Sequence, residues 1–170
     1  MLRRACIWPL IMVVAFCWLA PVIAEGAPVQ WATSAGGNGH WYEAVLVTGS
    51  ITWDNAKAAA LARGGYLVTI TSAAENAFAY GLVSGDSRFW YPLGNSGLGP
   101  WLGGIQQTPC SPEPSCGWTW ANGEPWGYTA WSTDEPNNNL GNEDAVHFYS
   151  VSTPMGSAWN DITRSSDLGL

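Results

Sequence analysis

The chain has 170 residues, of which 47% are hydrophobic and 12 are Trp, and its 13 acidic and 6 basic side chains give a formal net charge of -7. This length and apolar content exclude a disordered chain and suit one domain with its own core. An acidic surface poor in Lys and Arg is a poor match for phosphate backbones or anionic membranes, so no nucleic-acid partner is expected.

The first 24 residues have the pattern of a secretory signal peptide. A basic start, MLRR, precedes the apolar run CIWPLIMVVAFCWLA, and Val22 and Ala24 stand where a signal peptidase requires small or aliphatic residues. We therefore predict cleavage after Ala24, a secreted protein in the extracellular space or the periplasm, and no membrane insertion of the mature chain. A retained anchor is the alternative, although the run is short for a spanning helix, which needs about 20 apolar residues.

Two cysteines, Cys110 and Cys116, remain in the mature chain. In an oxidising compartment they are expected to pair with each other. The closed loop is small, so the bridge should contribute about 2 kcal/mol and pin a loop without holding the domain together. A zinc site is disfavoured, because the sequence has no further Cys or His near this pair.

The N-terminal half predicts a strand and then two helices with a short strand between them. Thr52 can cap the first helix, and Ser72 with Glu75 forms an S-x-x-E capping box at the start of the second. Gly-rich residues ahead of the first strand are expected to be a flexible lead-in. The predicted ranges are 25–39 for the lead-in, 40–49 for the first strand, 52–65 for the first helix, 66–71 for the second strand and 72–85 for the second helix.

Beyond Asp86 the helical patterns stop, and short strands separated by long loops are predicted. The strand AVHFYSV should place Val146 and Phe148 on one side. No internal repeat is present, and the order of elements predicts one α+β domain with a loop-rich half. The strand candidates are PWLGGIQQ, GWTW and AVHFYSV, at 100–107, 117–120 and 145–151.

The stretch EPNNNLGNEDAV, residues 135–146, concentrates three carboxylates and four asparagines in a chain with only 11% charged residues. Acidic side chains this close repel one another unless something positive lies among them. Carboxylate and amide oxygens are ligands for a hard cation such as Ca²⁺. On this stretch alone, a solvated acidic loop and a cation site both remain open.

Residues 40–161 resemble the C-type lectin-like domain in its calcium- and sugar-binding form. The motifs that carry the resemblance are WLGG at 101–104, EPN at 135–137, ED at 143–144 and WND at 159–161, in this order behind two helices. The resemblance implies an α+β fold over residues 40–170, with two helices, short antiparallel sheets and a long calcium-binding loop region. A bacterial source would fit Ala145 and Arg164, which stand where the family often has cysteines.

The resemblance also implies a site. The expected Ca²⁺ ligands are Glu135, Asn137, Glu143, Asn160 and Asp161, and the first four are also expected to contact carbohydrate. Glu-Pro-Asn accompanies mannose-type hydroxyls in the family, as in mannose, glucose, N-acetylglucosamine and fucose, and its Pro peptide bond, here Glu135–Pro136, is expected to be cis. Asp144 and Asn138 fall where some relatives bind an auxiliary calcium, but Asn138 replaces the usual Asp there.

Other interpretations remain open. The family's closing strand, which pairs with the first strand, is not found before Leu170, so either the sequence is truncated or the fold is completed otherwise. The domain could bind a protein or another non-sugar ligand with calcium as a structural clamp, which free monosaccharide would not displace. A glycoside hydrolase would also use paired carboxylates, but these match metal ligands in spacing, so an enzyme is not expected.

Three further expectations concern aromatic residues and assembly. Trp126 and Trp131 lie in the long loop and could stack on a sugar, although buried packing is the simpler interpretation. His40 and His147 show no partner pattern and are expected to be structural. A homo-oligomer would add avidity to a site that makes few contacts.

Overall fold

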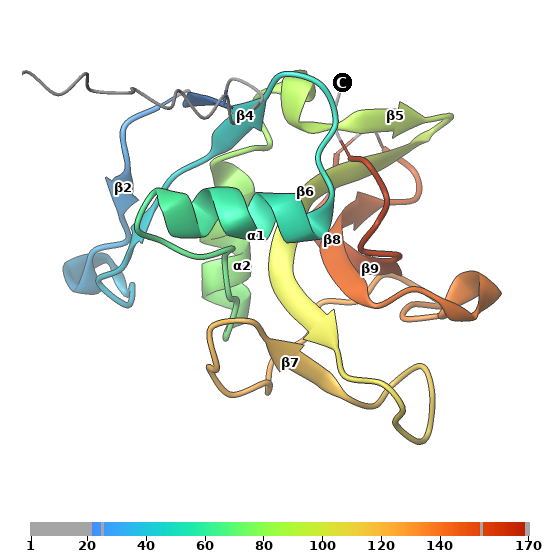
Figure 1. The fold of residues 1–170 in the computed structure, drawn as a ribbon. Coiled ribbons are helices and arrows are strands. Elements are labelled where there is room, and N and C mark those ends of the chain that lie inside the picture. Colours follow the sequence, from blue (N-terminus) through green and yellow to red (C-terminus); the bar gives the residue numbers. More distant parts are fainter. Residues whose placement is uncertain (1–21, 25, 154, 169–170) are drawn as a thin grey trace, which may run out of the picture.

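Two helices and a five-stranded antiparallel sheet form the framework of the computed structural model, which describes residues 22–24, 26–153 and 155–168 (Figure 1). The predicted α+β class is confirmed. Most of the predicted signal peptide, residues 1–21, lies outside the described residues. Within the part of the chain that is described, no helix combines the length and the apolar character that a membrane span requires.

Both helices begin at the predicted caps. Helix α1, Trp53–Ala62, has the Thr52 hydroxyl accepting from the backbone N–H of Asn55, and α2, Ala73–Gly81, has Ser72 accepting from Glu75. The reciprocal half of the capping box does not form as predicted. The Glu75 carboxylate accepts instead from the backbone N–H of Thr71, at 2.7 Å, and from the Tyr42 hydroxyl, at 2.6 Å.

This second bond joins α2 to an N-terminal hairpin of β2, Val29–Gln30, and β3, Trp41–Tyr42. Trp31, inside the hairpin, stacks on Phe78 of α2 with ring centroids 5.4 Å apart. Part of the segment 25–39, which was expected to be a flexible lead-in, is therefore folded against α2.

The predicted first strand continues beyond the hairpin as β4, Val45–Val47, and two segments pair near it. Backbone bonds of 2.8 and 3.1 Å join Ile51 to Leu168, close to the end of the described chain. Strand β1, Val22–Ala24, pairs antiparallel with β4. Strand β1 lies within the predicted signal peptide, so cleavage after Ala24 would remove a partner of β4.

The large sheet contains five strands, Tyr91–Leu93 (β5), Ser96–Gln106 (β6), Trp118–Trp120 (β7), Ala145–Ser150 (β8) and Ala158–Ile162 (β9). Their order in the sheet is β5-β6-β8-β9, and β7 also pairs with β6. Strand β9, which carries Asn160 and Asp161, was not predicted. The predicted strand at 66–71 is wrong: these residues form no strand, and their bond to β6 runs from the Gly103 N–H to the Val68 oxygen at 2.8 Å. The pairing of β6 with β7 begins at Gly104, directly beside this bond, so the segment 66–71 contacts β6 without forming a ladder.

Two apolar clusters hold the sheet. The larger one places Val146 and Phe148 of β8 together, as their spacing predicted, with Trp159 of β9 and residues of α2. The smaller one gathers Trp53 of α1 with Trp101 of β6. The glycines of WLGG allow this close packing, because a Cβ on Gly104 would lie 2.6 Å from a Val146 methyl carbon.

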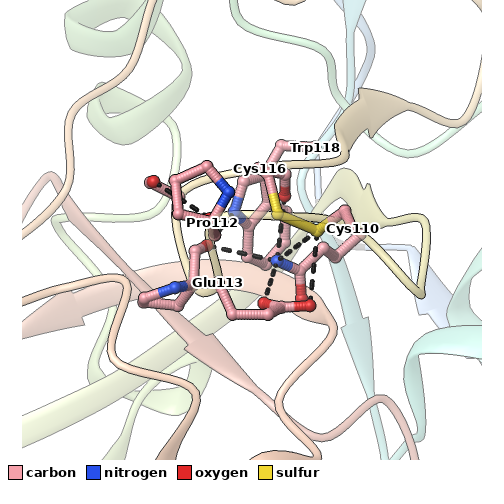
Figure 2. Close-up of a disulfide and its surroundings, with 8 residues drawn as sticks. Cys110, Pro112, Glu113, Cys116 and Trp118 are labelled. Atoms are coloured by element: carbon pink, nitrogen blue, oxygen red, sulfur yellow. Dashed lines mark hydrogen bonds between the residues drawn. A yellow bond between two sulfur atoms is a disulfide. The ribbon is translucent and has the colours of Figure 1, made fainter.

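The predicted disulfide is present, and Figure 2 shows it in the loop between β6 and β7. The Trp118 indole donates to the Pro114 carbonyl at 2.9 Å, so the loop is also tied to the start of β7. Glu113 lies with the two sulfurs in a cluster of potential metal ligands. The sulfurs are bonded to each other, so this cluster offers no thiolates to a metal.

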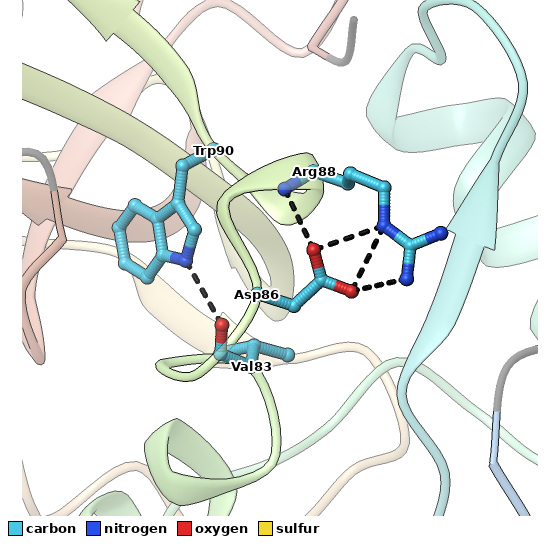
Figure 3. Close-up of polar contacts among 4 residues, drawn as sticks. All are labelled: Val83, Asp86, Arg88 and Trp90. Atoms are coloured by element: carbon cyan, nitrogen blue, oxygen red, sulfur yellow. Dashed lines mark hydrogen bonds and ion pairs between the residues drawn. The ribbon is translucent and has the colours of Figure 1, made fainter.

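The chain passes from α2 into β5 through a turn that contains Ser87–Phe89 (Figure 3). The Asp86 carboxylate accepts from the backbone N–H and the guanidinium of Arg88, and these bonds lower the pKa of Asp86. The Trp90 indole then donates to the Val83 carbonyl at 3.1 Å and enters the core. This anchored turn leads the chain into β5, which lies at the end of the strand order of the large sheet.

Candidate functional site

The acidic loop is fastened to the sheet by Asp161 of β9. This side chain is fully buried, and its two carboxylate oxygens accept the backbone N–H groups of Asn137, at 3.0 Å, and Asn138, at 2.8 Å. Hydrogen bonds from two N–H groups stabilise an ionised carboxylate away from water. Asp161 therefore joins the two tripeptides that were 24 residues apart in the sequence.

The loop also bonds to itself. The Asn138 side-chain oxygen accepts from the Glu143 N–H at 3.0 Å, and Glu143 in turn accepts from the Asn139 N–H at 2.7 Å. Asn138 has a φ of 47°, a left-handed conformation that asparagine tolerates better than most residues. The Glu135–Pro136 bond is cis, as expected.

These contacts form an open cleft of about 270 Å³ at the surface. Four of the five predicted ligands line it, namely Glu135, Asn137, Glu143 and Asn160. The fifth, Asp161, is buried close enough to raise the pKa values of both glutamates. The structure thus brings together all five residues, from the loop and from β9.

Burial and crowding of charge act most strongly on Glu135. Burial and the nearby charge of Asp161 raise its pKa to about 7, with smaller contributions from Glu143 and Asp134. Burial also raises the pKa of Glu143, which the Asn139 N–H partly offsets. The Oε2 atom of Glu135 is buried and has no hydrogen-bond partner among the described residues.

His147, expected to be only structural, contacts a candidate ligand. It lies on β8 opposite Asn160 of β9, is fully buried, and its Nε2 lies 3.1 Å from the Asn160 amide nitrogen. Burial lowers the His147 pKa to about 4, so the ring is neutral at pH 7 and Nε2 can accept from the amide. The amide oxygen is then free to face the cleft. The sequence lacked a sign of this contact, because it depends on the register between β8 and β9.

The two loop tryptophans pack inside. Trp126 lies 4.5 Å from Trp120 and Trp131 lies 5.0 Å from Trp118, measured between ring centroids. Both are partly buried against the larger cluster. This supports the packing interpretation over stacking on a sugar.

The region of the possible auxiliary calcium contains a positive side chain. The Asp144 carboxylate accepts from the backbone N–H of Arg164 at 2.9 Å, and the Arg164 guanidinium lies 3.7 Å from the same carboxylate and 3.4 Å from that of Asp54. Asn138 is engaged with Glu143. A guanidinium beside Asp144 disfavours a second cation at this place.

Comparisons with known proteins agree with the resemblance drawn from the tripeptides. The family model described as the lectin C-type domain matches residues 49–168. The chain is 29% identical over 116 residues to a perlucin-like protein of Mytilus galloprovincialis, covering 68% of this chain, and 31% identical over 126 residues to lectin BRA-3 of Megabalanus rosa, covering 73%. In each case the match spans 64% of the relative's own length.

The fold agrees as well. The crystal structure of C-type lectin CEL-I from Cucumaria echinata superposes with a TM-score of 0.53 at 26% identity, covering 69% of this chain and 79% of that one. The predicted fold, with two helices and antiparallel sheets, is confirmed. These three relatives are animal proteins, so the bacterial source remains a prediction without support from them.

Proposed function

This chain belongs to the C-type lectin domain family, and we propose that it is an exported module that binds carbohydrate through a calcium ion held in the acidic cleft. The observation that carries the proposal is the Glu135 Oε2 atom, which is buried without a hydrogen-bond partner among the described residues. A buried anionic oxygen in this situation is costly unless a cation pairs with it. The raised pKa of Glu135 expresses the same cost.

The residues present fit Ca²⁺ in kind. Calcium takes six to eight oxygen ligands from carboxylates, amide carbonyls, backbone carbonyls and water. Glu135, Glu143 and Asp161 offer carboxylates, and Asn137 and Asn160 offer amide oxygens. Three carboxylates against one divalent ion leave about one negative charge, and the described residues that line the cleft include no Lys or Arg.

Calcium, when bound, supplies coordination positions that two neighbouring sugar hydroxyls can fill. The chain's own side chains then select the hydroxyls, because Glu135 and Glu143 can only accept hydrogen bonds when ionised, whereas Asn137 and Asn160 can also donate. The Glu-Pro-Asn tripeptide supports mannose-type hydroxyls through its resemblance to the family. The predicted signal peptide and the disulfide support an exported protein.

The test is affinity chromatography on immobilised mannose with calcium in the buffer. We expect retention of the protein, elution by a calcium chelator, and competition by methyl α-mannoside more than by methyl α-galactoside. Retention that ignores the chelator would contradict the calcium dependence. If free monosaccharides do not reduce the retention, a non-sugar ligand with calcium as a structural clamp is favoured.

A double variant tests which residues select the sugar. Changing Glu135→Gln together with Asn137→Asp exchanges the positions of acceptor and donor. Preference should then move toward galactose-type hydroxyls. A double variant that still binds calcium and keeps its mannose preference would show that other residues make the selection.

A further inference from the structure

Part of the cleft is apolar. Beside its carboxylates and amides, it is lined by Leu93 of β5, Leu98 of β6, Tyr149 of β8 and Ile162 of β9, which we call the apolar wall. Leu98 lies opposite Tyr149 in the strand register, and the alternation along β9 places Ile162 on the same face as Asn160. One face of the sheet therefore presents the wall and a candidate ligand together.

The outer end of the wall is open to solvent. Leu93 is 56% exposed, whereas Val146 and Phe148 on the opposite face of β8 are buried in the core. A leucine with this exposure gains little from folding, because little of its surface is removed from water. Its place at the rim of the cleft makes its apolar surface available to a ligand.

A second exposed leucine lies beside the cleft. Leu140 follows the lining residue Asn139, is 92% exposed, and has a φ of 61°, in a left-handed region that costs a leucine roughly 1–2 kcal/mol. The β5–β6 hairpin and the turn Asn139–Gly141 extend on the same side of the molecule (Figure 1). Apolar side chains are thus presented by both projections.

The dimensions and charge of the cleft limit what can occupy it. Its volume of about 270 Å³ lies just below the roughly 300–1,000 Å³ typical of pockets for drug-sized ligands, so the occupant is a small molecule. A folded protein partner would instead need a contact surface of about 800 Å². An anionic group would face the carboxylates of Glu135 and Glu143. A neutral sugar ring with a small apolar group fits both limits.

We propose that the ligand is an amphiphilic glycoside, whose vicinal hydroxyls bind at the polar half of the cleft and whose short apolar aglycone lies against the apolar wall. This inference rests on the function proposed above. Leu93 is its specificity-determining residue, because it is the most exposed member of the wall and is not among the residues assigned to calcium or to the hydroxyls.

The test compares methyl, butyl and hexyl α-mannosides, which share the same hydroxyls, by calorimetry on the full chain with calcium. Burial of one or two CH₂-sized groups should tighten binding roughly four- to fifteen-fold from methyl to butyl. Leu93→Asn should reduce this gain, taken as the ratio of butyl to methyl α-mannoside affinity within the same protein, to less than about twofold. The matched control is Leu61→Asn, because Leu61 on α1 is 58% exposed, and it should keep the full gain.

The outcomes separate this inference from the function on which it rests. Normal binding of methyl α-mannoside without any gain for the longer chains would overturn the apolar subsite and leave the lectin function standing. An equal gain in wild type and Leu93→Asn would overturn the assignment to this wall, as would a hexyl mannoside that binds equally in chelator. If no mannoside binds while calcium does, both proposals fall.

Discussion

Glu135 is the residue whose ionisation is disfavoured both by burial and by neighbouring negative charge. Burial and the charge of Asp161 disfavour ionisation and raise the pKa of its carboxyl from the ordinary 4.5 to about 7 in the folded protein. The folded state therefore holds a proton that the unfolded chain has already lost between these two pH values. By linkage, Glu135 makes the free energy of unfolding decrease as pH rises through this window, whereas His147, whose pKa burial lowers to about 4, contributes in the opposite direction.

We accordingly expect the stability of the calcium-free wild type, measured relative to Glu135→Gln, to fall as pH rises from about 4.5 to about 7. The variant is the reference because its amide carries no titrating proton, and the contributions of Glu143 and His147 are common to both proteins. Urea unfolding of both metal-stripped proteins at several pH values measures the difference, and a difference that stays constant or shifts in favour of the wild type across the window would contradict the charge crowding.

His147 offers a second test at the residue level. Its Nε2 lies 3.1 Å from the Asn160 amide nitrogen, and this contact leaves the Asn160 oxygen free for the cleft. His147→Leu places an apolar side chain in the core and removes the Nε2 acceptor. Loss of one hydrogen bond of about 1 kcal/mol should weaken calcium binding roughly fivefold.

The matched variant is His147→Gln, whose side-chain oxygen can accept the same bond and should restore most of the affinity. Calorimetric titration with calcium gives the comparison, and the melting temperature without calcium reports the structural effect of each change. Equal calcium affinity in the Leu variant and the wild type would show that His147 does not orient Asn160.

At the level of elements, the sequence predicted best those features that are decided locally. Thr52 and Ser72 cap the two helices because a hydroxyl needs only the N–H groups of the next turn. The segment 66–71 has the composition of a strand but meets β6 at Gly103, next to the residues that pair with β7, and forms no ladder there, so composition alone misplaced it. Strand β9 was missed because SAWND is short and owes its conformation to pairing with β8.

The residues of the candidate site also divide into those that the sequence predicted and those that depend on strand pairing. Its carboxylates and asparagines were identified because they cluster in the sequence and match the tripeptides of a family. The contact of His147 and the four members of the apolar wall depend on the register of β5, β6, β8 and β9, which the sequence does not specify locally. Glu75 shows the same limit, because its capping box was predicted from spacing and its bond to Tyr42 was not.

Asp161 tests how the loop is held to β9. Its two oxygens accept the backbone N–H groups of Asn137 and Asn138, so these amides should exchange slowly with solvent. Asp161→Ala should expose both amides to fast exchange and abolish calcium binding, while the amides of α1 and α2 stay protected. Hydrogen exchange followed by mass spectrometry or NMR gives this comparison. Protection of Asn137 and Asn138 that persists in the variant would show that the loop is ordered without Asp161.

For the whole molecule, calcium should connect the acidic loop to the stability of the domain. The chain carries a formal net charge of -7, and Glu135, Glu143 and Asp161 meet where the loop joins β9. A ligand that binds the folded state and not the unfolded chain stabilises by mass action, by about 2.7 kcal/mol at a concentration of 100 times its Kd. In a domain of this size, this should raise the melting temperature by roughly 5–10 °C.

Thermal melts in calcium, in magnesium and in chelator measure this effect on wild type and on Asp161→Ala. Magnesium has the same charge but retains its water more strongly, so it should stabilise less. The Asp161 variant should melt at one temperature in all three solutions. Acid should erase the wild-type shift, because protonated carboxylates no longer bind the ion. Equal melting temperatures for the wild type in calcium and in chelator would mean that EPNNNLGNEDAV is a solvated acidic loop, with no ion between the loop and β9.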